Sequence, residues 1–312
     1  MRTFAAPMNM ETINKEKAIR LSGLIMRMAT HVICHTLVDY QDLLKDERMS
    51  IAHAFLQRAT STHLCNHKLT VEGIVYKYKN QPFLLPEEYK TMTLTRTVYE
   101  HLAMFFFLFH HPRTVVERDI AWKYWQINSK KNLLDYCSDD DETSGDQQRL
   151  TEEIETLRQQ ILTSHIGVQC HQKLDQWTAL GSPGNNGGLQ FVVRGGRYDV
   201  RRIPYSQAWR FLFDNRDMAQ FYSYLSIHCH PVFDGLRQYQ EQADGSQEEE
   251  GVPLYFSCCF LAQLCALFLR QIPGSETILK SEFNRHELST FHTLSQLPKD
   301  KKPRRSKPLG RA

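Results

Sequence analysis

Apolar residues recur every three or four positions over much of the chain, which is the spacing of one face of a helix. Residues 11–44 and 47–79 follow this pattern and predict two long helices at the start of the sequence. Pro86 and the two acids after it suit a helix first turn, because proline is tolerated there and carboxylates complement the helix dipole. A third helix is therefore expected over residues 86–110.

The next two expected helices are separated by an acidic segment. Thr114, with Glu117 three residues later, forms a capping-box pattern, which predicts a helix over 114–137. Residues 139–146 are too acidic and polar to pack in a core, so we expect a loop there. A further helix is expected over 147–177.

Residues 181–203 differ in character from the rest of the chain. A cluster of Gly, Pro and Asn comes first, and two β-prone runs then flank Gly195 and Gly196. This arrangement predicts a small β-hairpin near 189–203. More helices are expected at 204–213, 215–230, 253–271 and 276–296. The fold class is therefore all-α, an antiparallel multi-helix bundle with one small hairpin.

The chain has 312 residues, enough for a single helical domain over 1–297, and we expect its core within 86–235. Residues 298–312 form a basic, Pro-rich tail that we expect to be disordered. From Lys299 onward there are seven basic residues and one acidic residue, so subtracting this +6 from the total of +3 leaves −3 for the rest. The overall basicity is therefore no evidence for a nucleic-acid-binding fold.

Cysteine usage and hydropathy indicate where the protein resides. The eight cysteines include no Cys-x-x-Cys pair, and several lie in apolar runs, which is typical of reduced thiols in a cytoplasmic protein. The N-terminus lacks the pattern of a signal peptide. Residues 254–269 are the most membrane-like stretch, but they are shorter than the roughly 20 apolar residues that a bilayer needs. We therefore expect a buried helix there, no membrane contact and a cytoplasmic location.

Two pairs of histidines raise the question of a metal site, since His31 with His35 and His63 with His67 each have a four-residue spacing. Each pair could present two ligands on one helix face. Bundles that bind two metals also use Glu-x-x-His segments, and the sequence contains none. We interpret the pairs as ordinary core or surface histidines and expect neither a metal nor a cofactor.

Arg96 and Glu100 stand four residues apart in the third expected helix, directly before the strongly apolar run 102–109. Their spacing puts both side chains on one helix face, where they can pair. Moving such charges out of water costs several kcal/mol per ion, so a pair that enters a core has a structural or a chemical reason. It is either a clasp between helices or part of a functional site.

These two residues belong to a longer pattern. It consists of Arg96 and Glu100, then Arg118 with Trp122 and Tyr124, then Ser226 and His230 in a Leu-Ser-x-x-x-His segment. Over about residues 85–235 the pattern resembles the signature of a bacterial family of uncharacterised helical proteins, which is similar to the HEPN superfamily of nucleotide- and RNA-acting bundles. The resemblance implies an antiparallel bundle, a homodimer or a partner protein, and a role as a ribonuclease toxin or defence effector.

Metal-independent RNA cleavage needs an acid or base and a fixed cation. An imidazole such as that of His230 titrates near neutral pH, and Arg96 or Arg118 could stabilise the charge of a phosphorane. Glu100 would orient an arginine, and Ser226, one helical turn before His230, could fix the imidazole tautomer. The alternative is a non-catalytic scaffold or protein-interaction module in which the same residues only hold helices together.

A second candidate site lies near the C-terminus. The HEPN ribonuclease motif is an arginine and a histidine with four to six residues between them, and Arg285 and His292 fit it with six. Two helical turns put both side chains on one face, where a water or a phosphate could bridge them.

Arginines gather around the expected hairpin at Arg194, Arg197, Arg201 and Arg202. Guanidinium groups near aromatic side chains can hold phosphates and stack on bases, which favours RNA or a nucleotide as the partner. The alternative is a hairpin edge that its charges protect from pairing with another strand.

Overall fold

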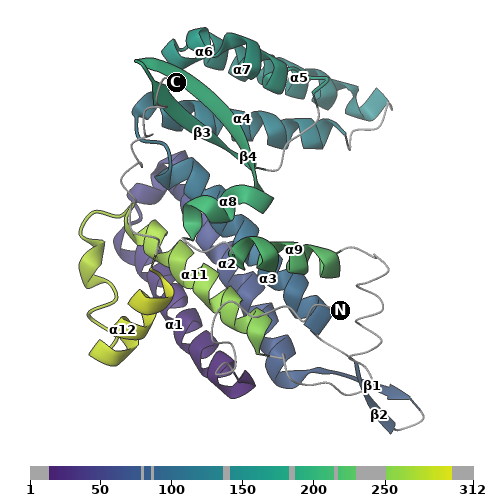
Figure 1. Cartoon of the computed structure of the whole chain (residues 1–312), viewed down its shortest axis with the longest axis vertical. Coiled ribbons are helices and arrows are strands. Elements are labelled where there is room, and N and C mark those ends of the chain that lie inside the picture. The colour runs from purple at the N-terminus through teal and green to yellow at the C-terminus, as the bar shows by residue number, and fades with distance from the viewer. Residues whose placement is uncertain are drawn as a thin grey trace, which may run out of the picture.

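Helices make up most of the chain that the computed structural model describes, which is residues 14–78, 81–85, 88–135, 141–182, 187–213, 217–229 and 251–296. They form two parts stacked along the long axis of the molecule, as Figure 1 shows. The all-α class expected from the sequence is confirmed.

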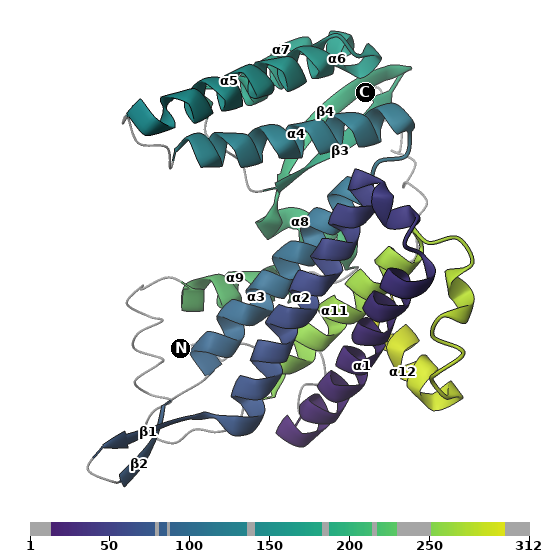
Figure 2. The ribbon, with the colours of Figure 1, turned by 180° about the vertical axis from the view of Figure 1, so that it is seen from behind.

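The first part, which we call the main bundle, comes from both ends of the described chain. Its helices are α1 (Lys15–Asp39), α2 (Glu47–Glu72), α3 (Glu88–Phe105), α8 (Tyr205–Leu212), α9 (Asp217–Cys229), α11 (Val252–Leu269) and α12 (Arg285–Leu294), with short turns η2 (Leu43–Lys45), η3 (Phe106–His110) and η4 (Ser275–Thr277). Helices α1, α2, α3 and α11 lie side by side (Figure 2), and α8 and α9 pack on α3.

Helix α11 is the buried helix expected over residues 254–269. Within the described chain, α1 and α11 are long and apolar enough to cross a membrane, and 33% and 78% of their respective apolar windows lie inside the protein. Even the polar side chains of Ser257 and Gln263 are buried on α11. Because it contacts α1, α2 and α3 at once, α11 is the central helix of the main bundle.

The second part, which we call the α4–α7 layer, has a core of its own. It contains α4 (Val115–Leu134), α5 (Asp141–Leu162), α6 (His165–Gln169) and α7 (His171–Thr178), with the hairpin of β3 (Gly187–Arg194) and β4 (Arg197–Pro204). Ile120 and Tyr124 of α4 pack against Ile154 and Ile161 of α5 in this core. The chain enters the layer after α3 and returns to the main bundle at α8.

The hairpin expected near 189–203 is present. Gly195 and Gly196 form its two-residue turn with φ values of 56° and 78°, the left-handed region that such a turn needs and that glycine adopts without strain. The two strands pair in register from Gly187 opposite Pro204 to Arg194 opposite Arg197.

This hairpin joins the two cores. Leu189 and Val200 pack in the core of the α4–α7 layer, whereas Ile203 belongs to the core of the main bundle. Gly188 approaches Phe107 so closely that a Cβ built on it would lie 2.1 Å from the ring. A side chain at Gly188 would therefore push the hairpin away from the main bundle.

Helix α2 ends earlier than the expected boundary at residue 79. It stops at Glu72 because Gly73 adopts a φ of 72°. The residues that follow form β1 (Ile74–Tyr78), which pairs antiparallel with β2 (Gln81–Leu85). The run Ile-Val-Tyr is β-prone, so a second small hairpin forms where the sequence pattern predicted more helix.

Three other expected ranges were also wrong. The loop expected over 139–146 overlaps α5, which begins at Asp141, because acids stabilise a helix first turn. The helix expected over 147–177 is three helices, because Ser164 caps a new one through its side chain. The helix expected over 276–296 is shorter, and it begins only after Asn284, whose side chain accepts from the backbone of Glu287.

The main core is not restricted to the middle of the chain. It includes buried residues of α1, α2 and α11, all of which lie outside residues 86–235. Helix α4 instead contributes to the core of the α4–α7 layer. The basic tail over 298–312 lies outside the described residues.

The capping box at the start of α4 is confirmed. The Glu117 backbone N–H donates to Thr114 Oγ1 at 3.1 Å, and the Thr114 N–H donates to Glu117 Oε2 at 3.4 Å. We expect Thr114→Ala to lower the free energy of unfolding by about 1 kcal/mol, because the cap oxygen is lost. Urea unfolding measures this change, and Thr114→Ser, which keeps the hydroxyl, should stay near the wild type.

Candidate functional site

The Arg96–Glu100 pair forms on α3 as the spacing predicts. Arg96 Nε donates to Glu100 Oε1 at 2.8 Å across one helical turn. The two side chains keep 22% and 30% of their surface exposed, whereas Leu102 and Phe105 just beyond them are fully buried. The pair therefore lies at the edge of the core, where solvent or a ligand can still reach it.

Helix α9 completes this centre with an aromatic side chain. Tyr222 Oη donates to Glu100 Oε1 at 3.3 Å, although 122 residues separate the two in sequence. The Arg96 guanidinium carbon lies 5.5 Å from the centre of the Tyr222 ring, which is cation–π distance. The Tyr99 ring also contacts Tyr222, with its centre 5.0 Å from that of the Tyr222 ring and its plane tilted by 48°. Two distant segments of the chain thus meet in what we call the Arg96–Glu100–Tyr222 centre.

The environment holds the groups of this centre in defined protonation states. Burial works to lower the pKa of Arg96, but its contacts with Tyr222 and Glu100 outweigh burial and raise it. Burial and the neighbouring Glu100 raise the pKa of Tyr222, and burial also raises the pKa of Tyr99 and of Tyr205. At neutral pH the centre therefore presents a fixed cation beside protonated phenols.

The remaining residues of the α9 segment are placed only in part. Ser226 Oγ donates to the backbone carbonyl of Tyr222 at 2.9 Å, so its proton is used within its own helix. The Cys229 thiol lies 3.6 Å from Thr93 Oγ1 of α3, which keeps this end of α9 against the same helix. His230 lies outside the described residues.

Arg118 stands apart from the Arg96–Glu100–Tyr222 centre. It is exposed on the first turn of α4 and shares no hydrogen bond or ion pair with Arg96 or Glu100. Its companions in the pattern are buried, Trp122 against the end of α3 and Tyr124 in the core of the α4–α7 layer. These aromatic residues therefore pack inside the protein, whereas the arginine that precedes them is on the surface.

The second candidate pair lies on the surface of α12. Arg285 begins this helix, His292 is in its last turn, and both are exposed. Seven residues of helix separate them by about 10 Å along the axis, so they do not touch. Their helix is fixed to α1 by an ion pair between Glu287 and Arg27 at 2.7 Å.

The four hairpin arginines divide into two groups. Arg194, Arg197 and Arg201 are exposed, whereas Arg202 is half-buried. The guanidinium carbon of Arg202 lies 5.1 Å from the centre of the Trp177 ring of α7, so this residue joins the hairpin to a helix.

The sequence did not predict a chain of polar contacts in the main bundle, which is centred on the fully buried His63. His63 of α2 bonds Ser22 of α1 through Nε2 at 2.8 Å and Ser257 of α11 through Nδ1 at 2.7 Å. His67 extends the chain, with Nδ1 2.9 Å from the Ser22 hydroxyl. Burial, followed by the nearby His67, lowers the pKa of His63 to about 3. This chain joins three helices and is closed to solvent at His63.

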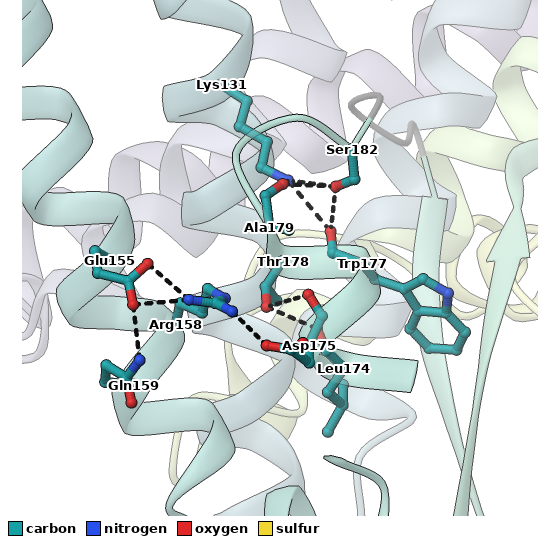
Figure 3. A network of polar contacts seen from close by, with 10 residues as sticks. All are labelled: Lys131, Glu155, Arg158, Gln159, Leu174, Asp175, Trp177, Thr178, Ala179 and Ser182. Carbon is teal, nitrogen blue, oxygen red and sulfur yellow. Dashed lines mark hydrogen bonds and ion pairs between the residues drawn. The ribbon is translucent and has the colours of Figure 1, made fainter. Parts of the chain in front are cut away.

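A second unforeseen polar network lies in the α4–α7 layer (Figure 3). Lys131 of α4 is only 4% exposed, and its ammonium donates to the Trp177 carbonyl at 3.2 Å, to the Ala179 carbonyl and to Ser182 Oγ at 2.7 Å. Burial, with Arg202 and Arg158 nearby, lowers the pKa of Lys131 to about 8. The network ties the end of α7 to α4, and a lysine beside another lysine in the sequence gave no sign of it.

The histidine pairs do not form a metal site with other described side chains. Among the described residues, no three His, Cys, Asp or Glu side chains come close enough together to hold a metal ion. The pairs His31 with His35 and His63 with His67 instead bond protein groups, such as the Ile278 carbonyl 3.0 Å from His31.

The fold and the centre define a helical bundle in which an Arg–Glu pair on one helix meets a tyrosine from a later one. The chain belongs to a family of unknown function, DUF5677, whose model matches residues 88–248. This range starts at α3, contains the whole Arg96–Glu100–Tyr222 centre, and leaves out Arg285 and His292. No curated protein and no solved structure matches the chain.

Proposed function

We propose that the protein is a HEPN-like RNA-acting effector, a metal-independent ribonuclease or toxin-like protein of bacterial defence that acts in the cytoplasm. The observation that carries the proposal is that Arg96 and Glu100 keep 22% and 30% of their side-chain surface exposed beside the buried Tyr222, within the region matched by the family. A polar group that serves only to hold a core together has no need of solvent access, whereas a group that acts on a phosphate requires it.

Each residue has a defined task in this reaction. The 2′-hydroxyl attacks the adjacent phosphorus, its proton passes to a base, and the leaving 5′-oxygen receives a proton from an acid. Arg96 stabilises the charge that builds on the phosphorane, while Glu100 and Tyr222 hold its guanidinium in place. His230, the next residue in the chain after Cys229, is the acid or base. Arg118 and Ser226 have no role in this scheme.

The alternative is a non-catalytic scaffold or interaction module. It is favoured by one observation, that the hydrogen bond from Tyr222 to Glu100 joins α3 to α9 as a structural clasp would. The two proposals differ in what the loss of Arg96 removes, which is chemistry in the first case and stability alone in the second.

The test is cleavage of RNA by purified protein and growth arrest on expression. We expect Arg96→Ala and His230→Ala each to lower the cleavage rate by about 100-fold or more, because a charge-stabilising group or a proton donor is lost. Arg20→Ala removes an exposed arginine of α1 and should leave the rate unchanged. Circular dichroism checks that every variant is folded.

Two outcomes would contradict the proposal. A folded Arg96→Ala that cleaves as fast as the wild type would exclude the Arg96–Glu100–Tyr222 centre from the reaction. A wild type that neither arrests growth nor alters RNA, while Arg96→Ala lowers the melting temperature, would favour the scaffold.

A further inference from the structure

The register of the β3–β4 hairpin selects which arginines share a face. Residues directly opposite each other in an antiparallel pair point to the same side. Arg194 stands opposite Arg197, and Arg201 stands opposite Gln190 on the same side, because positions 197 and 201 are an even number of residues apart. All three arginines are exposed. Gly188 and Ile203, at the far end of this side, pack on the main bundle. We call the rest of this side, which carries the three arginines, the outer face.

The other side of the hairpin is occupied by the protein itself. Leu189 and Val200 pack there in the core of the α4–α7 layer, and Arg202 lies on the Trp177 ring. Arg202 therefore joins the hairpin to α7. The three arginines of the outer face make no such contact with Trp177.

Positive charge on the outer face is only partly neutralised. Asp199, the acid of this face, pairs with Lys173 of α7 and accepts from Arg201 Nε at 3.3 Å. Arg194 and Arg197 pair with no carboxylate in the described part of the chain. Like charges directly opposite each other destabilise a hairpin by up to about 1 kcal/mol, so the fold gains nothing from this pair.

Protection of the β4 edge does not explain the arginines beside Tyr198. At this residue the free edge of β4 is already paired with the end of α6, since the Tyr198 N–H donates to Gln169 Oε1 at 2.9 Å and the Tyr198 carbonyl accepts from the Cys170 thiol at 3.2 Å. An edge that is already paired needs no charge to keep other strands away.

We infer that the outer face of the hairpin binds the phosphate backbone of single-stranded RNA. Guanidinium groups offer the planar fork of donors that phosphates accept. Arg197 and Arg201 are separated by about 13 Å along the strand, which suits phosphates of separate nucleotides in an extended chain better than the single phosphate group of a nucleotide. The choice of RNA rests on the proposed function, whereas the site itself rests on the register, the exposure and the unpaired charge.

The inference is tested by fluorescence anisotropy with a labelled oligouridylate at several salt concentrations. We expect the double variant Arg194→Gln and Arg197→Gln to weaken binding about tenfold and to reduce the dependence of log affinity on log salt by about 1.4, the value for two lost phosphate contacts. The matched control removes two exposed arginines of the main bundle, Arg20→Gln and Arg270→Gln, and should bind as the wild type does.

Equal weakening by both double variants, or no binding by the wild type, would overturn the inference. Binding of duplex DNA as tight as that of the oligouridylate would overturn the assignment to RNA. If only the hairpin variant loses binding while Arg96→Ala still cleaves, the outer face stands and the proposed centre fails. If Arg96→Ala loses cleavage and the hairpin variant binds normally, the centre stands and the outer face fails.

Discussion

Lys131→Met is expected to lower the free energy of unfolding by about 3 kcal/mol, because it removes an ammonium that donates three hydrogen bonds. Methionine fills a similar volume but donates nothing, so the Trp177 and Ala179 carbonyls at the end of α7 lose their charged partner. These carbonyls are the negative end of the α7 dipole, which a cation stabilises. Figure 3 shows that Lys131 reaches Ser182 and both carbonyls at once.

Urea unfolding followed by circular dichroism measures this loss. Lys130→Met is the matched control, since its ammonium pairs with Glu153 at the surface, where solvent screens the ion pair and it contributes little to stability. A loss for Lys131→Met no larger than that for Lys130→Met would contradict the importance of the network.

Acidification from about pH 7.5 to about pH 5 is expected to cost about 2 kcal/mol of stability through His63 alone. The pKa of His63 in the folded protein is about 3, below its unfolded value of about 6.5. Between these two pKa values, the imidazole of His63 is protonated in the unfolded state and neutral in the folded state. As far as His63 is concerned, the folded state therefore has its full stability above pH 6.5. This stability is lost progressively as the pH falls toward 3, because the unfolded state gains a proton.

The pH dependence of unfolding by urea tests this expectation. His63→Gln keeps a polar side chain but cannot take up the proton, so its stability should vary less with pH than that of the wild type. His171→Gln, at an exposed position of α7, should retain the full dependence. The same pH dependence in wild type and His63→Gln would show that other buried histidines, such as His111, cause the loss.

Local patterns in the sequence were sufficient for most helices but not for all boundaries. The capping box at Thr114 and the Gly195–Gly196 turn were predicted correctly, because each depends on residues close together in the chain. The end of α2 at Gly73 was missed, because a short run such as Ile-Val-Tyr at 74–76 is compatible with either a helix or a strand.

The contacts of the candidate site could be predicted only in part. The Arg96–Glu100 pair follows from helical spacing, whereas the approach of Tyr222 depends on how α9 packs on α3. The partners of His63 lie 41 and 194 residues away, and no spacing rule connects them. Arg118 is exposed because α4 packs mainly in the α4–α7 layer. No motif in the sequence predicts this position of α4.

The position of α11 has a consequence for how the protein is made. Helices α1, α2 and α3 all pack on α11, yet roughly 200 residues are synthesised between the end of α1 and the start of α11. At translation rates of roughly 5–20 residues per second, α1 is complete about 10–40 s before the synthesis of α11 begins, and α2 and α3 are complete for a shorter time. The residues of these helices that pack on α11 in the folded protein lack this partner during the interval. We therefore expect chaperones to bind the nascent chain until its most apolar helix emerges from the ribosome.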